Sequence, residues 1–207
     1  QFPLTLESFG DFKPALYSYI LIPSVALFGL NKFSVRFPNA LVGTFAVLFT
    51  YLMVEELFKS RKEGLLASKH KAVAKTAALL LAVSSWHVML SRGGFEANLT
   101  TLLTPLAVYL FLKGLKKPKA LIFSAFVFGL NIFSYHSARV VTPLLLVMLV
   151  FAFRKELLRI EKKKLLAPVL IFFALFGLTI YTFFSGAGRR ASDVSIFRGA
   201  LEEAAPD

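Results

Sequence analysis

The sequence of 207 residues contains no cysteine and few charged residues. Without cysteine the chain forms no disulfide and no thiolate metal site, and its composition leaves the redox state of its compartment open. Asp, Glu, Lys and Arg make up only 17% of the residues, whereas hydrophobic residues make up 57% and Phe alone occurs 23 times. The mean hydropathy of +0.68 is far above that of a soluble domain of this length. The composition therefore excludes a soluble globular protein.

Seven stretches without a charged residue run along the chain, each between 14 and 24 residues long. They are Pro14–Asn31, Phe37–Val54, Thr76–Ser91, Ala97–Leu112, Ala120–Ala138, Val140–Phe153 and Leu165–Gly188. A helix needs about 20 apolar residues to cross the hydrocarbon core of a bilayer. The shortest stretch reaches that length if its helix begins near Tyr135 and Arg139 extends its charged end to the interface. The sequence therefore predicts an all-α fold, a polytopic membrane helix bundle with about seven transmembrane helices.

The distribution of basic residues predicts the orientation of this bundle. The chain carries 24 Lys and Arg against 12 Asp and Glu, and the basic residues lie in short connectors, which argues for membrane topology and against nucleic-acid binding. The alternate connectors Lys59–Lys75, Lys113–Lys119 and Arg154–Lys164 hold sixteen of the 24, and the other side holds eight. Because Lys and Arg stay in the cytoplasm, we predict a protein of the cytoplasmic (inner) membrane with both chain ends outside.

Both ends of the sequence indicate that the chain is part of a longer protein. The chain starts at Gln1 with a polar segment that fits an outer loop, and an odd number of helices starting outside implies an upstream helix. The polar residues Arg189–Asp207 fit the beginning of a further extracytoplasmic loop. We therefore expect residues 1–207 to form one partial transmembrane domain, without its first helix and first outer loop.

Most of the polar residues that suggest chemistry fall on the side with fewer positive charges. Ionisable residues at a membrane boundary are costly to keep and usually face a partner, a cavity or a substrate. The predicted topology brings together residues from four separate parts of the sequence: Asp11, Lys13, Tyr17, Arg36, His87, Arg92, Glu96, His136 and Arg139. This convergence predicts a functional site at the outer face.

Arg92 and Glu96 are four residues apart, so on one helix they would share a face. They then form either an interfacial salt bridge or a site in which Arg92 meets an anion and Glu96 orients a polar acceptor or a catalytic group. Gly93 and Gly94 favour the second interpretation, because two glycines allow close approach of the backbone. Asn98-Leu99-Thr100 fits a glycosylation sequon, but it falls in a predicted membrane helix and we discard it.

Two further segments suggest binding of phosphate. In Tyr135-His136-Ser137-Ala138-Arg139 a planar guanidinium lies beside a histidine, which suits phosphate, although an interfacial tyrosine and a snorkelling arginine explain the pattern as well. Lys13 precedes the first predicted helix, where its charge opposes the helix dipole unless an anion is near. A solvated helix start is the alternative there. Trp86 and His87 mostly resemble an interfacial aromatic belt.

These segments together resemble the dolichyl-phosphate-mannose protein mannosyltransferase family, membrane glycosyltransferases of the C-type fold, in a prokaryotic form. The resemblance runs from about Phe9 to Phe197 and is carried by four motifs in order: Gly10–Tyr17, Phe28–Pro38, Trp86–Asn98 and Tyr135–Arg139. Ala15 and Ser85 stand where the family usually has proline, which affects helix starts more than chemistry.

The resemblance implies an enzyme that transfers a sugar, of hexosyl or mannosyl type, from a polyprenyl-phosphate donor to a protein, lipid or glycan acceptor outside the membrane. The presumed general base of the family lies in a first outer loop, which would precede Gln1, and its role is not transferred to Asp11. By match to the motifs, Glu96 would be the second acidic residue of the site. The expected substrate-binding residues are Asp11, Lys13, Tyr17, Arg92, His136 and Arg139.

The implied chemistry fits these residue types. Displacing a lipid phosphate needs a base for the acceptor proton and fixed positive charge where negative charge grows. The sequence points to no particular cofactor and leaves a divalent metal open. The main alternative is a flippase or transporter of lipid-linked sugars, and a polymerase or ligase of lipid-linked glycans is a third class. Transport would favour charged residues near the membrane midplane, whereas the candidate residues lie at predicted helix ends.

Overall fold

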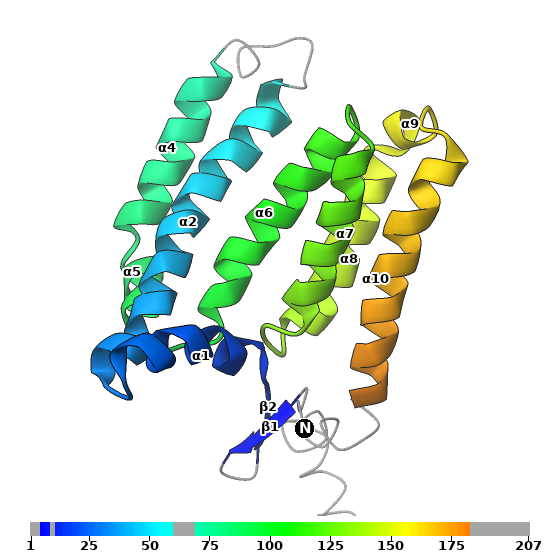
Figure 1. Ribbon diagram of the computed structural model, residues 1–207. Helices are drawn as coiled ribbons and strands as arrows, with labels where there is room; N and C mark the ends of the chain where they lie inside the picture. Colours follow the sequence, from blue (N-terminus) through cyan, green and yellow to red (C-terminus); the bar gives the residue numbers. More distant parts are fainter. Residues whose placement is uncertain (1–4, 9–10, 60–68, 183–207) are drawn as a thin grey trace, which may run out of the picture.

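The computed structural model describes residues 5–8, 11–59 and 69–182, and this part of the chain is almost entirely helical (Figure 1). A short hairpin precedes the helices. In chain order the elements are β1 (Thr5–Ser8), β2 (Asp11–Pro14), α1 (Leu16–Phe28), α2 (Lys32–Lys59), α4 (His70–Val83), α5 (Ser85–Arg92), α6 (Asn98–Gly114), α7 (Lys119–Ile132), α8 (Ala138–Ala152), α9 (Arg154–Leu157) and α10 (Lys162–Thr182).

Six helices lie side by side and form the bundle. Helices α4, α2, α6, α7 and α10 are neighbours in that order, and α8 packs against α7 (Figure 1). Helix α1 instead lies crosswise over one end of the bundle, next to the hairpin. With 13 residues it is about 20 Å long, too short to cross the hydrocarbon core.

Each of the seven predicted apolar stretches overlaps a helix, but seven membrane spans are not confirmed. By length and composition, α2 and α10 can cross a membrane. Helices α4 and α5 add a third span only if they are one span broken by a 59° bend. The remaining apolar helices, such as α7 with 14 residues and α8 with 15, are shorter. The expected outer segment Arg189–Asp207 lies outside the described residues.

The N-terminal hairpin was not predicted. Strands β1 and β2 pair antiparallel, with Leu6 opposite Lys13 and Thr5 opposite Pro14. Pro14 has no amide hydrogen to donate, which suits the last position of a strand. Lys13 precedes α1 as expected, but it lies within β2 and not in a solvated helix start.

The connectors divide the bundle into two unlike ends. The end of α2, the start of α4, the α6–α7 turn and α9 lie at one end, which is the end of the basic connectors (Figure 1). The hairpin, α1, the α5–α6 turn and the α7–α8 turn lie at the other. The elements that carry the candidate site residues thus share one end of the bundle.

Two apolar clusters hold the helices together. The larger one joins α6, α7, α8 and α10 and contains Phe111, Phe128 and Ile132. The smaller one joins α1, α2 and α6 through Tyr17, Val42 and Leu99. The second cluster fixes the crosswise helix to the bundle, directly beside the turn that precedes α6.

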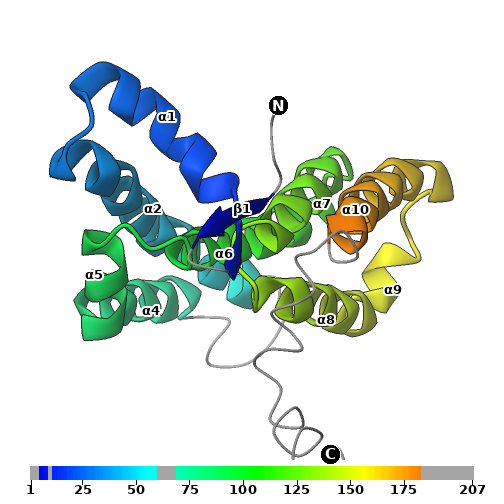
Figure 2. The ribbon, with the colours of Figure 1, turned by 90° about the horizontal axis from the view of Figure 1, so that it is seen from below.

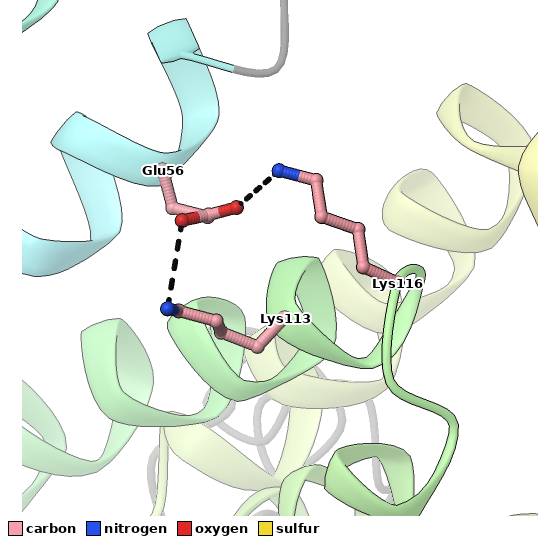
Figure 3. Close-up of polar contacts among 3 residues, drawn as sticks. All are labelled: Glu56, Lys113 and Lys116. Atoms are coloured by element: carbon pink, nitrogen blue, oxygen red, sulfur yellow. Dashed lines mark hydrogen bonds and ion pairs between the residues drawn. The ribbon is translucent and has the colours of Figure 1, made fainter.

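One buried carboxylate is neutralised at the basic end. Glu56 of α2 accepts a hydrogen bond from Lys116 Nζ at 2.6 Å, and Lys113 Nζ lies 3.8 Å from its other carboxylate oxygen (Figure 3). The Glu56 side chain is only 9% exposed. These contacts tie the end of α2 to the turn between α6 and α7.

Replacing Glu56 by Gln is expected to destabilise the fold. The variant keeps the shape of the side chain but removes its charge, and hydrogen bonds to charged groups contribute about 1.5–3 kcal/mol. Thermal unfolding in detergent should therefore show a lower melting temperature. The matched control is Glu55→Gln, because no described residue forms an ion pair with Glu55. Equal melting temperatures for the two variants would contradict the importance of this cluster.

Candidate functional site

The candidate residues lie at the end of the bundle opposite the basic connectors. Figure 2, which views this end, shows the hairpin in front of α6, with α1 and α5 on one side and α7 and α8 on the other. Two turns face this end. One joins α5 to α6 and carries Glu96, and the other joins α7 to α8 and carries His136.

Two fully buried asparagines hold the first turn, and sequence reasoning did not find their role. Asn39 of α2 donates from Nδ2 to the carbonyls of Leu90, at 2.8 Å, and of Gly93, at 2.7 Å. Asn98, the first residue of α6, donates from Nδ2 to the Oδ1 of Asn39 at 2.9 Å and to its backbone oxygen at 3.1 Å. Both asparagines are 0% exposed. They connect α2, the end of α5 and the start of α6.

Arg92 and Glu96 do not share a helix face, so that prediction is wrong. Helix α5 ends at Arg92, and Gly93 takes an extended conformation with φ −87° and ψ −178°. Glu96 therefore lies in the turn before α6. No described carboxylate forms an ion pair with Arg92, which is exposed, while Glu96 is half-buried. The simple salt bridge is not formed.

Tyr17 lies close to this first turn. Its hydroxyl donates to the carbonyl of Val35 at 2.9 Å, and the residue is only 6% exposed. A Cβ added at Gly94 would lie 3.3 Å from Val35 Cγ1 and 3.9 Å from the Tyr17 hydroxyl, so the backbone approaches closely here. Burial, together with the negative charge of Glu96, raises the pKa of Tyr17 to about 12. The structure thus brings Tyr17 and Glu96 together and keeps the phenol neutral.

The second turn is held by another buried amide. Asn131, near the end of α7, donates from Nδ2 to Thr142 Oγ1 at 2.9 Å and to Thr104 Oγ1 at 3.1 Å. Ser134 donates to the carbonyl of Asn131 at 2.6 Å. These bonds join α6, α7 and α8. They fix the chain on both sides of His136, which is half-buried and has its ring edge-on to that of Tyr135.

Arg139 is the candidate cation at the beginning of α8. It is half-buried, and its Nε is buried without a hydrogen-bond partner among the described residues. The described part of the chain also provides no carboxylate in an ion pair with it. A buried guanidinium nitrogen without a partner is costly unless a ligand supplies an acceptor. An anion with several oxygens would satisfy it.

The two turns have the same backbone hydrogen bonds, forty residues apart. The amide of Asn98 donates to Phe95 O and that of Leu99 donates to Glu96 O, both at 3.1 Å. In the second turn Ala138 donates to Tyr135 O and Arg139 donates to His136 O, both at 3.2 Å. Glu96 and His136 therefore occupy equivalent positions. The two sequences share little, so the amino-acid sequence alone does not show this repetition.

The two remaining predicted substrate-binding residues lie in the hairpin, whereas Arg36 lies near the start of α2. Lys13 is half-buried in β2, and no described residue forms an ion pair with it. Asp11 is the first residue of β2, opposite Ser8, and its side chain lies outside what the structure describes. Across the described residues, no group of three His, Cys, Asp or Glu side chains gathers as a metal site would require.

His87 anchors α5 against α2. It is 3% exposed and its Nε2 lies 3.1 Å from the carbonyl oxygen of Gly43, whereas its neighbour Trp86 is exposed as an interfacial residue would be. Helix α5 can approach α2 because residue 43 is a glycine. A Cβ at that position would clash with the Ser91 side chain, reaching within 2.6 Å of its Cβ. Close packing of these two helices thus places Arg92 at the end of the bundle.

Gly43→Ala is expected to destabilise the protein and displace α5. Alanine is favoured over glycine in a helix by about 1 kcal/mol, but overpacking costs about 1–3 kcal/mol, so the clash decides the sign. Gly177→Ala in α10 is the control, because nothing lies within 4 Å of the added Cβ there. Thermal unfolding should show a loss for the first variant and no loss for the second. A gain for Gly43→Ala would contradict the close packing.

Comparison with known proteins gives one family match. The model of the family described as dolichyl-phosphate-mannose-protein mannosyltransferase matches residues 12–181, which include α1 to α9, both turns and all but the last residue of α10. No curated protein and no solved structure matches the chain. The matched range covers most of the chain and contains every predicted site residue except Asp11. The chain therefore belongs to the dolichyl-phosphate-mannose-protein mannosyltransferase family.

Proposed function

We propose that this chain forms the transmembrane part of an enzyme that transfers a sugar from a polyprenyl-phosphate donor to an acceptor on the outer face of the inner membrane. Family membership indicates a membrane glycosyltransferase that uses a lipid-linked sugar. The donor, the mannosyl or hexosyl type of sugar and the outward orientation are our proposal. The acceptor is a protein, a lipid or a glycan.

The observation that carries the proposal is the buried, unpartnered Nε of Arg139 at the end of the bundle that also holds Glu96. The cations Lys13, Arg92 and Arg139 all belong to elements at this end, and no described carboxylate neutralises them. Fixed positive charge that is not already paired can stabilise an anion whose charge grows during reaction. A lipid phosphate meets this requirement.

The proposed reaction is displacement at the anomeric carbon of the donor. The acceptor hydroxyl oxygen forms a bond to that carbon while the bond from the carbon to the phosphate oxygen breaks. The electron pair leaves with the polyprenyl phosphate, where Arg139, His136, Arg92 and Lys13 stabilise it. The proton of the acceptor hydroxyl passes to a general base, which we assign to no described residue. Glu96 orients the acceptor or the group that takes its proton.

A flippase or transporter of lipid-linked sugars is the alternative. It would need the same affinity for a lipid phosphate but would break no bond. Transport favours polar binding residues near the middle of the membrane, between broken helices. Here Glu96 and His136 lie in turns at one end of the bundle, which supports chemistry at the membrane surface.

Arg139→Gln in the intact protein is expected to weaken binding of the polyprenyl-phosphate donor. Loss of a charge-assisted hydrogen bond costs about 1.5–3 kcal/mol, which is roughly a ten- to more than hundred-fold loss of affinity. The dissociation constant can be measured by titrating purified protein with the donor in detergent. Arg159→Gln, an exposed arginine at the opposite end, should leave that affinity unchanged. Equal affinities for both variants would contradict the proposed phosphate site.

The proposed orientation predicts which end of the bundle is outside. Since the chain has no cysteine, single cysteines can be introduced at exposed positions of the two ends. A thiol reagent that does not cross membranes should label Ser137→Cys in intact cells and should label Lys117→Cys only after the membrane is opened. The reverse pattern would place the candidate site in the cytoplasm.

A further inference from the structure

Asn39 uses its whole amide group to connect three elements. Its two N–H hydrogens go to the carbonyls of Leu90 and Gly93, and its Oδ1 and backbone oxygen accept from Asn98. The residue has no exposed surface. Leu90 and Gly93 carry carbonyls at the end of α5 that no longer have a partner within the helix. Asn39 supplies the missing donors from a neighbouring helix.

The contacts of Asn39 lie on both sides of the residues proposed to meet the substrate. Leu90 and Gly93 flank Arg92, while Gly93 and Asn98 flank Glu96. Each flanking residue is hydrogen-bonded to Asn39 itself. The turn that carries Glu96 is therefore held on both sides by one buried side chain that has no exposed surface, whereas the exposed Arg92 side chain lies outside these contacts.

Neighbouring contacts leave the turn little freedom to compensate. Val35, four residues before Asn39 and on the same face of α2, accepts the Tyr17 hydroxyl and faces Gly94. Gly43, four residues after Asn39, accepts from His87. The turn is thus packed between Tyr17 and α2. A change at Asn39 would shift the turn against these groups, and a shift of about 1 Å can cost about a hundred-fold in rate.

We propose that Asn39 is a positioning residue for sugar transfer, acting through the α5–α6 turn on Glu96. This inference rests on the proposed function, because it assumes that Glu96 acts during transfer. Asn39 touches no substrate. Its role is to hold the carboxylate where the acceptor is oriented, so its loss should slow transfer more than it weakens donor binding.

The test compares Asn39→Asp with Ser124→Ala in the intact protein. Asn39→Asp is nearly isosteric but replaces both N–H donors by an acceptor oxygen. Ser124→Ala removes a buried hydrogen bond of 2.8 Å to the Ala107 carbonyl in the middle of the bundle. Sugar transfer at saturating donor and acceptor should fall about tenfold or more in Asn39→Asp, with donor affinity within about threefold of the unmodified protein. Ser124→Ala should lower the melting temperature and keep the turnover.

A double-mutant cycle separates positioning from general stability. If Asn39 acts through Glu96, then adding Asn39→Asp to Glu96→Gln should lower transfer by no more than about twofold further, because the effects share one cause. Asn39→Asp should also lower the melting temperature, and this decrease should still occur in the double variant. Independent, multiplying losses of transfer would overturn the positioning role. So would a loss of turnover in Asn39→Asp no greater than in Ser124→Ala.

Two further measurements keep the outcomes distinct. Asn98→Asp removes the Nδ2 group that donates to Asn39. It should reproduce the slower turnover, and it tests the proposal if Asn39→Asp does not fold. Normal turnover in Asn98→Asp would overturn the proposal. Unchanged transfer in Glu96→Gln would overturn the role of Glu96 and the positioning role with it. No sugar transfer by the unmodified intact protein would overturn the proposed function itself.

Discussion

The site depends on hydrogen bonds made by one face of α2. Along this face Val35, Asn39 and Gly43 follow at four-residue intervals, and each meets a different part of the site. Val35 accepts from Tyr17, Asn39 donates to the end of α5, and the carbonyl of Gly43 lies against His87. In an apolar bundle a buried polar group without a partner costs more than its bond would gain, so such contacts specify one arrangement. The crosswise helix, α5 and the first turn are all placed by this face.

A turn held by a buried asparagine occurs twice at this end of the bundle. Each turn is held by a buried asparagine that bonds to neighbouring helices, and each has the same pair of backbone hydrogen bonds as its helix begins. The residues at equivalent places differ in charge type: Glu96 in the first turn and His136 in the second. The same backbone geometry therefore carries a carboxylic acid in the α5–α6 turn and an imidazole in the α7–α8 turn. Two turns of the same backbone structure can thus supply the different side chains that one reaction needs.

The sequence predicted where the helices lie but not which of them are long enough to cross the membrane. Uncharged runs locate helices because every backbone polar group in lipid must bond within its own segment, and the basic connectors do gather at one end. Hydropathy does not say whether an apolar helix crosses a membrane or lies over the bundle, so α1 was counted as a span. The break between α4 and α5 carries no proline at Ser84 to reveal it. Asn39 was missed because a single asparagine in an apolar run forms no pattern, and Asn98 entered only as a discarded sequon and as the end of the Trp86–Asn98 motif. Their hydrogen-bond partners are 51 to 59 residues away in the sequence, and hydrophobic periodicity gives no information on contacts at that separation.

The position of the crosswise helix α1 also indicates how deep in the membrane the candidate site lies. At the corner between α1 and α2, Leu27 and Leu30 are 78% and 84% exposed, and the rings of Phe28, Phe33 and Phe37 cluster beside them. Leaving so much apolar surface in water is unfavourable, so lipid covers this corner in a membrane. The hydrocarbon layer then extends up to the level of α1, and the two turns at the same end meet the layer of lipid head groups. In the proposed function, a phosphate attached to a polyprenyl chain would reach that level with its tail still in the bilayer.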